Sequence, residues 1–270
     1  MNNGLDKQQS VLGDLSIRLL SYAQMKGKTI ARTGEFSPVL GITESQEKNL
    51  LSRLARSGFI IRLRRGVYLI PERIPAGGKY NPGTAYILNK LFEELKGSYQ
   101  ICGPVCFSRY GFDDQLPNVT HIYNTRISGK RTIVEQRYVF IKVSDERLGA
   151  VRTLKSDSGI DVYYSSKTRS LLDAVYDWWR FNSLPRAYTW IRGAAKDASV
   201  MTELIDITIH YGNQSTKRRI GYLLDSMNAS ENDLYRLSSS ISSLSSTIPF
   251  VPEAGTKGKV NKKWGIIQNE

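Results

Sequence analysis

The stretch GITESQEKNLLSRLARSGFIIRLRRGVYLIP, residues 41–71, decides the expected fold of the amino-terminal region. Thr43 is expected to cap a helix that runs to about Ser57, because a hydroxyl at this position accepts a hydrogen bond from a backbone N–H group without a helical partner. Gln46, three residues later, completes the pattern of a capping box. One side of this helix carries the apolar residues Leu50, Leu51 and Leu54. The pattern predicts a helix with one buried face and one exposed face.

A β-hairpin is expected directly after this helix. Gly58 suits the left-handed exit of a helix, and residues 61–64 alternate between apolar residues and arginine before the chain returns as Val67-Tyr68-Leu69. Arg65 and Gly66 form the expected turn between the two strands. A helix followed by a tight hairpin with arginines on its edge is the layout of a winged helix-turn-helix.

The basic residues of this stretch indicate DNA binding. Between residues 48 and 65 there are six basic residues and no acidic one. The candidate DNA-binding residues are Thr43, Ser45, Gln46, Lys48, Asn49, Arg53, Arg56, Arg62, Arg64 and Arg65. Of these, Ser45, Gln46, Asn49 and Arg53 are of types that read base edges, and Lys48, Arg56, Arg62, Arg64 and Arg65 are expected to hold phosphates. The alternative is a small helix and hairpin whose arginines are merely solvated.

Composition points to a polyanionic partner. The 270 residues carry a formal net charge of +13. Nucleic acid is favoured over an anionic membrane surface, because the sequence shows no amphipathic basic helix and no lipidation motif. No apolar run approaches the ~18 residues of a membrane-spanning helix, and the first ten residues lack the apolar core of a secretory signal. The sequence therefore predicts a cytoplasmic protein.

The remaining sequence predicts an α+β protein with an N-terminal winged helix-turn-helix and a mixed α/β C-terminal domain whose C-terminal half is helical. The expected divisions are a DNA-binding domain at 1–75, a Pro- and Gly-rich linker at 76–82, a mixed α/β regulatory domain at 83–248 and a basic tail at 249–270. The tail is expected to be extended and held to the protein by Trp264.

Three expected elements of the C-terminal domain are specific enough to test. Residues 132–143 are predicted as one strand, because they are rich in β-branched and aromatic residues. A helix that begins near Ser166 is predicted to bury Trp178 and Trp179. The last helix is predicted at 231–246.

No catalytic or metal-binding constellation is recognised. His121 and His210 lack the neighbours of a metal site, and Cys102 and Cys106 have no second ligand pair, so both cysteines are expected to be buried. Nuclease-like pairs of Glu135 with Lys142, or Asp161 with Lys167, are disfavoured. The sequence predicts a protein that is not an enzyme and that needs no cofactor or metal.

A second basic group lies in the C-terminal half. Lys217, Arg218 and Arg219 are consecutive, and Arg186, Arg192 and Lys196 lie upstream. Two interpretations stay open: a solvated helix face, or a second DNA surface that contacts phosphates.

Four segments in order resemble the AbiEi family, the antitoxins of abortive-infection (type IV) toxin–antitoxin systems. They are SRLARSGFIIRLRRGVYLIP, SYQICGPVCFSRYGFDDQLPNVTHIYNTR, SSKTRSLLDAV and STKRRIGYLLD, and the resemblance spans about Leu15 to Asp225.

The resemblance implies a transcriptional repressor with two partners. Its amino-terminal domain would bind inverted repeats in double-stranded operator DNA at its own promoter. Its C-terminal domain would counter a nucleotidyltransferase-like toxin without a stable complex. The alternatives are a nucleic-acid-modifying enzyme with a winged-helix targeting domain and a regulator that binds a protein directly.

Overall fold

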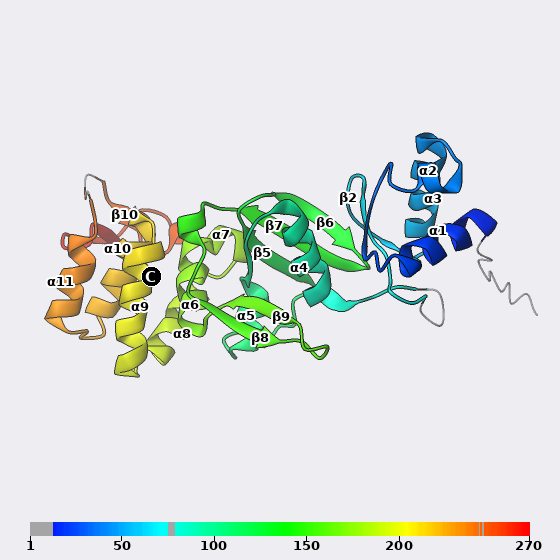
Figure 1. Ribbon diagram of the computed structural model, residues 1–270. Helices are drawn as coiled ribbons and strands as arrows, with labels where there is room; N and C mark the ends of the chain where they lie inside the picture. The colour runs from blue at the N-terminus through cyan, green and yellow to red at the C-terminus, as the bar shows by residue number, and fades with distance from the viewer. Residues whose placement is uncertain (1–12, 75–78, 243, 245) are drawn as a thin grey trace, which may run out of the picture. The chain divides into compact units, whose positions relative to one another are not determined.

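The computed structural model describes residues 13–74, 79–242, 244 and 246–270. The chain divides into two compact units: Met1–Leu95 with Thr132–Gln136 form the amino-terminal unit, and Lys96–Arg131 with Arg137–Glu270 form the carboxy-terminal unit. Figure 1 shows the elements of both. Helices and sheets occur in both units, so the predicted α+β class is confirmed. Residues 76–78 of the expected linker lie outside the described residues.

The amino-terminal unit has the element order of a winged helix. Its elements are α1 (Asp14–Met25), β1 (Ile30–Arg32), α2 (Ser37–Leu40), α3 (Glu44–Arg56), β2 (Ile61–Arg64), β3 (Val67–Leu69) and α4 (Gly83–Leu95). The three strands form a sheet in the order β1-β3-β2, with both pairs antiparallel. The β2–β3 hairpin is the wing.

Local sequence signals fix the ends of α3 and the wing as predicted. The Gln46 N–H donates to Thr43 Oγ1 at 3.2 Å, and the Thr43 N–H donates to Gln46 Oε1 at 2.8 Å, which completes the capping box. Gly58 follows the helix at φ +81°, and Gly66 closes the hairpin turn at φ +74°. Both values lie in the left-handed region that glycine adopts at little cost.

The buried face of α3 is part of one apolar core. Leu50, Leu51 and Leu54 pack in a cluster with Leu19 and Leu20 of α1. All five side chains are buried. Burial of a leucine side chain contributes about 1.5–3 kcal/mol, so this cluster is the main source of stability that joins α1 to α3.

The carboxy-terminal unit is built on a six-stranded mixed sheet. Its strands are β4 (Tyr99–Cys102), β5 (Val119–Asn124), β6 (Gly129–Ile133), β7 (Gln136–Lys142), β8 (Val151–Lys155) and β9 (Asp161–Ser165), in the order β6-β7-β5-β4-β9-β8. Two short helices lie between the strands, α5 (Pro104–Arg109) and η1 (Asp145–Arg147). The last residues of β6 and the first residue of β7 belong to the amino-terminal unit.

The single strand predicted at residues 132–143 is wrong. A two-residue turn at Val134 and Glu135 divides this stretch into β6 and β7. Both turn residues have positive φ, 48° and 66°. This geometry suits a tight hairpin but is normally supplied by Asn or Gly, so these two residues carry no turn signal.

Helices make up most of the remaining chain. They are α6 (Lys167–Tyr176), α7 (Trp178–Phe181), α8 (Arg186–Ala194), α9 (Ala198–Tyr211), α10 (Gln214–Asp225) and α11 (Glu231–Ser239). Helix α6 contacts α8, α9 and α10, and α11 contacts α9 and α10, as Figure 1 shows.

Two helical predictions need correction. The last helix ends at Ser239 and not at residue 246. Trp179 was expected to be buried but is 60% exposed. The helix breaks at Asp177 (ψ 34°), so the residues of α7 no longer continue the buried face of α6.

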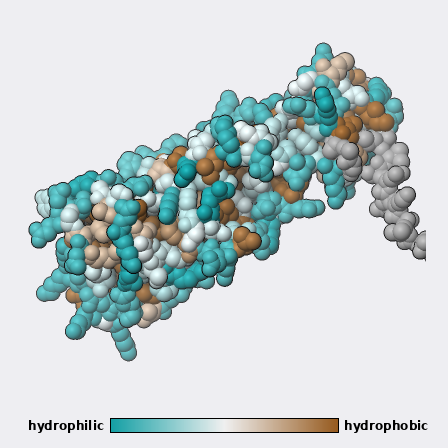
Figure 2. All heavy atoms as spheres, turned by 90° about the horizontal axis from the view of Figure 1, so that it is seen from below, coloured by the Kyte–Doolittle hydropathy of each residue, from teal (hydrophilic) through white to brown (hydrophobic). Residues whose placement is uncertain are grey.

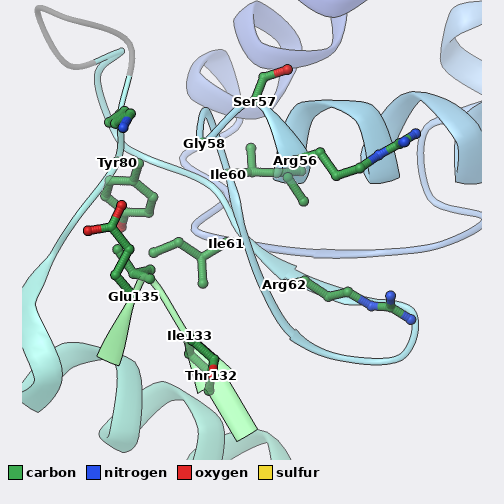
Figure 3. Close-up of a pocket in the computed structure, with 13 residues that line it drawn as sticks. Arg56, Ser57, Gly58, Ile60, Ile61, Arg62, Tyr80, Thr132, Ile133 and Glu135 are labelled. Atoms are coloured by element: carbon green, nitrogen blue, oxygen red, sulfur yellow. The ribbon is translucent and has the colours of Figure 1, made fainter. Parts of the chain in front are cut away.

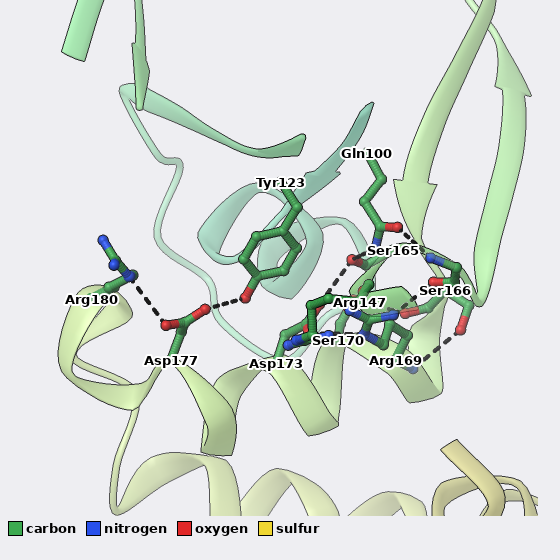
Figure 4. Close-up of polar contacts among 11 residues, drawn as sticks. Gln100, Tyr123, Arg147, Ser165, Ser166, Arg169, Ser170, Asp173, Asp177 and Arg180 are labelled. Carbon is green, nitrogen blue, oxygen red and sulfur yellow. Dashed lines mark hydrogen bonds and ion pairs between the residues drawn. The ribbon is translucent and has the colours of Figure 1, made fainter. Parts of the chain in front are cut away.

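A buried polar network joins α6 to the sheet (Figure 4). Asp173 accepts bonds from Arg147 at 2.8 Å, from Arg169 at 2.9 Å and from the Ser165 hydroxyl at 2.9 Å. Burial raises the pKa of Asp173, and the charge of Arg147 partly offsets this. Arg169 also donates to the carbonyl oxygens of Gly149 and Arg147, both at 2.8 Å. The SSKTRSLLDAV segment therefore has a structural role.

The C-terminal residues are folded and not an extended tail. They form a second sheet in the order β10-β12-β11, from β10 (Ile248–Pro249), β11 (Lys259–Asn261) and β12 (Ile266–Gln268), with the short helix η2 (Pro252–Ala254) between β10 and β11. Trp264 is fully buried, and its Nε1–H donates to Asp225 Oδ2 at 2.7 Å. The expectation that Trp264 attaches this segment is confirmed.

The described helices give no candidate for crossing a membrane, since none is both long and apolar enough. Figure 2 shows one face of the molecule on which hydrophilic residues predominate and hydrophobic residues form small patches. Scattered exposed apolar side chains of this kind are ordinary on a folded protein.

The contact between Gly221 of α10 and the Trp264 ring gives a stability prediction. A methyl group at Gly221 would overlap the ring. We expect Gly221→Ala to lower the free energy of unfolding by about 1–3 kcal/mol, because the overpacking outweighs the better helix propensity of alanine. Urea denaturation measures the change.

The matched control is Gly193→Ala in α8, where an added methyl group meets no atom within 4 Å. This variant should be as stable as the wild type or more stable by about 0.5–1 kcal/mol. Equal effects of the two substitutions would contradict the proposed packing of Trp264.

Candidate nucleic-acid interface

The structure places all ten predicted DNA-binding residues on the surface of the amino-terminal unit. Thr43 caps α3, and Ser45, Gln46, Lys48, Asn49, Arg53 and Arg56 lie along α3. Arg62 and Arg64 alternate with buried Ile61 and Leu63 on β2, and Arg65 lies in the wing turn. One helix and the hairpin that follows it therefore present the whole set to solvent.

The six cations of this set are free to bind anions. Within the described part of the chain, no carboxylate forms an ion pair with Lys48, Arg53, Arg56, Arg62, Arg64 or Arg65. Arg32 of the same unit differs, because it bonds Glu94 at 2.6 Å and lies 3.6 Å from Glu35. Cations without an intramolecular partner can neutralise phosphates without first breaking an ion pair.

Glu47 is a positioning residue of the candidate interface that the sequence interpretation missed. Its side chain is 0% exposed although it lies on α3 among polar neighbours. Its carboxylate accepts hydrogen bonds from the backbone N–H groups of Gly34 at 3.1 Å, Phe36 at 3.2 Å and Ser37 at 3.0 Å. The segment 34–37 leads into α2, so Glu47 fixes the start of α2 against α3.

The sequence contained one signal for Glu47. It lies three residues before Leu50 and four before Leu51, on the side of the helix that carries the buried leucines. A carboxylate on the apolar side of a helix requires partners, and backbone N–H groups at a helix start are suitable ones.

The structure does not place Lys217, Arg218 and Arg219 on a DNA surface. All three are buried in the first turns of α10. Lys217 donates to the Ser240 carbonyl at 3.2 Å, Arg218 to the carbonyls of Trp264, Gly265 and Ser246, and Arg219 to that of Pro249. Burial lowers the pKa of each group. These cations hold the C-terminal segment against α10.

The other members of the second basic group do not form one surface with them. Arg186 is paired with Asp113 at 2.8 Å, and Arg192 with Glu270 at 3.1 Å. Lys196 is exposed at the end of α8. The interpretation of Lys217, Arg218 and Arg219 as a second phosphate-contacting surface is therefore wrong, because these cations bond carbonyl oxygens inside the protein.

The fold and the exposed residues define the amino-terminal unit as a winged helix-turn-helix with a free cationic face. Residues 18–71 match the family model described as transcriptional regulator, AbiEi antitoxin. This match agrees with the resemblance for the first of the four segments, SRLARSGFIIRLRRGVYLIP, and the other three segments lie outside the matched residues.

A solved structure supports the fold of nearly the whole chain. The crystal structure of the RV2827C protein from Mycobacterium tuberculosis is similar with a TM-score of 0.53 at 13% sequence identity, and the match covers 95% of this chain and 92% of that chain. A likeness at this identity concerns the fold alone. No curated protein matches the sequence.

The bonds of Glu47 give a second stability prediction. Glu47→Ala should lower the free energy of unfolding by about 2–4 kcal/mol, because three N–H groups lose their acceptor. Glu44→Ala removes an exposed carboxylate from the first turn of the same helix and should cost about 0.5 kcal/mol.

Chemical denaturation of both variants makes the comparison. Equal losses from Glu44→Ala and Glu47→Ala would show that the Glu47 bonds do not hold α2 to α3.

Proposed function

We propose that this protein is a sequence-specific, non-enzymatic DNA-binding repressor. Ser45, Gln46, Asn49 and Arg53 on α3 read base edges in the major groove, while Lys48, Arg56 and the wing arginines Arg62, Arg64 and Arg65 hold phosphates. Its site is double-stranded operator DNA with inverted repeats at its own promoter, so the protein regulates its own expression.

The observation that carries this proposal is the set of six exposed cations on α3 and the wing that form no ion pair with any of the residues that the structure describes. Phosphate contacts supply most of the affinity of a DNA-binding protein and fix its register, whereas the polar residues of α3 supply the selectivity. Both kinds of residue lie on the two elements that a winged helix places on DNA.

We also propose that the protein is the antitoxin of an abortive-infection pair in the cytoplasm. Its carboxy-terminal unit counters a nucleotidyltransferase-like toxin, and it does so without a stable complex. This part is supported by the AbiEi antitoxin match at residues 18–71 and by the three further segments of the resemblance.

Two arginine substitutions should separate base reading from phosphate binding. Arg53→Ala should weaken operator binding by about 1–3 kcal/mol and relax the preference at one base pair. Arg64→Ala should weaken binding to all sequences equally and reduce the slope of log K against log salt by about 1. Gel-shift titrations at several salt concentrations measure both effects.

Arg18→Ala is the matched control, because it removes the same charge from the exposed side of α1, outside the proposed interface. It should leave operator affinity nearly unchanged. The interface is wrong if Arg53→Ala and Arg64→Ala behave as this control does.

A growth experiment tests the antitoxin role separately from DNA binding. Cells that express the neighbouring nucleotidyltransferase-like toxin should survive when they also express the Arg53→Ala, Arg64→Ala double variant. We expect both substitutions together to weaken DNA binding strongly and to leave the carboxy-terminal unit unchanged. The toxin and the wild-type protein should elute separately in size-exclusion chromatography. Failure of the wild-type protein to protect would refute the antitoxin role, and co-elution would refute antagonism without a complex.

A further inference from the structure

A pocket of about 350 Å³ lies in the amino-terminal unit beside the end of α3 (Figure 3). Its apolar wall is formed by Ile60, Ile61, Ile133, Val134 and the ring of Tyr80. This volume lies near the lower end of the range for small-molecule sites, about 300–1,000 Å³. At about 30 Å³ for a water-sized group, it holds roughly a dozen non-hydrogen atoms.

Four charged residues line this pocket, and two of them, Lys79 and Glu135, carry opposite charges and lie outside the proposed DNA interface. Lys79 and Glu135 both line it, and neither forms an ion pair with any residue in the described ranges. Their charges also do not pair with each other within 4 Å. Tyr80 and Glu135 line the same pocket, and Figure 3 labels both. Burial raises the pKa of Tyr80, so its side chain is a neutral phenol in this wall.

The end of α3 adds a third polar feature. Ala55, Arg56, Ser57 and Gly58 line the pocket where the helix ends. The C-terminal end of a helix carries a partial negative charge and favours cations. Together with Glu135 it favours an ammonium group, whereas Lys79 favours a carboxylate.

The turn that carries Glu135 is strained. Val134 has φ +48°, which is rare for a β-branched residue, because its side chain crowds the backbone in this region. Strained backbone is retained where the surrounding structure or a function requires it. Here the turn brings both an apolar and an acidic side chain to the pocket.

We propose that this pocket binds a small amphipathic zwitterion of the α-amino acid class, and that its occupancy changes the affinity of the protein for DNA. The carboxylate of the ligand pairs with Lys79, its ammonium group pairs with Glu135 at the end of α3, and its apolar side chain packs against Ile60, Ile61 and Ile133.

Ligand binding is coupled to DNA binding because the same two elements, α3 and β2, border the pocket and carry proposed DNA contacts. This part rests on the proposed DNA-binding function. The pocket lies against the end of α3 and the start of β2. Figure 3 shows the Arg56 and Arg62 side chains of these elements directed away from Tyr80 and Glu135. A ligand therefore contacts the same stretch of backbone that carries two proposed phosphate contacts, Arg56 and Arg62, which also line the pocket.

Calorimetric titration of the full chain with L-phenylalanine, L-leucine and L-tryptophan tests the binding site. Phenylalanine has a suitable size, and 3-phenylpropionate and phenethylamine are matched probes that lack its ammonium or its carboxylate. We expect phenylalanine to bind at least about tenfold more tightly than either probe, as the loss of one charged hydrogen bond predicts.

Two variants outside the proposed DNA interface locate the site. Lys79→Met should weaken phenylalanine binding about tenfold and leave phenethylamine binding unchanged. Glu135→Gln should also weaken phenylalanine binding about tenfold but leave 3-phenylpropionate binding unchanged. The site is refuted if none of the three amino acids binds, or if both variants bind them with the affinity of the wild type.

A gel-shift titration with and without saturating phenylalanine tests the coupling. Operator affinity should change at least threefold in the wild type and remain constant in Lys79→Met. Because coupling is reciprocal, operator DNA should change phenylalanine affinity by the same factor. Constant affinity in the wild type would refute the coupling. If the ligand-free protein failed to bind operator DNA, the proposed function would be wrong, whereas calorimetry would still decide the pocket.

Discussion

The arrangement of the helix-turn-helix depends on one buried carboxylate. Glu47 has no ion-pair partner in the described residues, and three backbone N–H groups at the start of α2 satisfy its oxygens instead. A buried charge is stable only when its hydrogen bonds are complete, so any displacement of α2 from α3 is opposed strongly. The hydrogen bonds of Glu47 position α3 from its buried side, while burial of the leucine side chains contributes most of the stabilising free energy. The shape of the interface thus depends on a residue that cannot itself contact DNA.

Most of the amino-terminal unit could be predicted because its signals are local. The capping box of α3, the glycine at its end and the Arg65-Gly66 turn each act over three or four residues, and the structure has all of them. The position of β1 beside β3 could not be predicted, since that pairing joins residues 30–32 to residues 67–69. Glu47 was missed for the same reason, because its three donors lie ten to thirteen residues earlier in the chain.

Two of the predictions that failed in the carboxy-terminal unit concern partners distant in sequence. Lys217, Arg218 and Arg219 bond carbonyl oxygens 23 to 47 residues away, and the acceptors at Pro249, Trp264 and Gly265 belong to the segment that was expected to be an extended tail. The wrong expectation for these cations and the wrong expectation for the tail have the same cause. A folded C-terminal segment needs these cations for its unpaired carbonyls, and the buried cations need the segment for acceptors. The turn at Val134 and Glu135 failed differently, because it uses residues that rarely adopt positive φ.

The two basic groups look alike in the sequence, yet helical geometry separates them. A helix turns about 100° per residue, so three consecutive residues cover about 200° of its circumference. Helix α10 contacts α6, α8, α9 and α11, so Lys217, Arg218 and Arg219 cannot all reach solvent. On α3, Lys48, Arg53 and Arg56 are spaced by five and three residues and fall within about 140° of arc, which the buried leucines leave open. Spacing, and not charge density, therefore distinguishes cations available to phosphate from cations that hold the protein together.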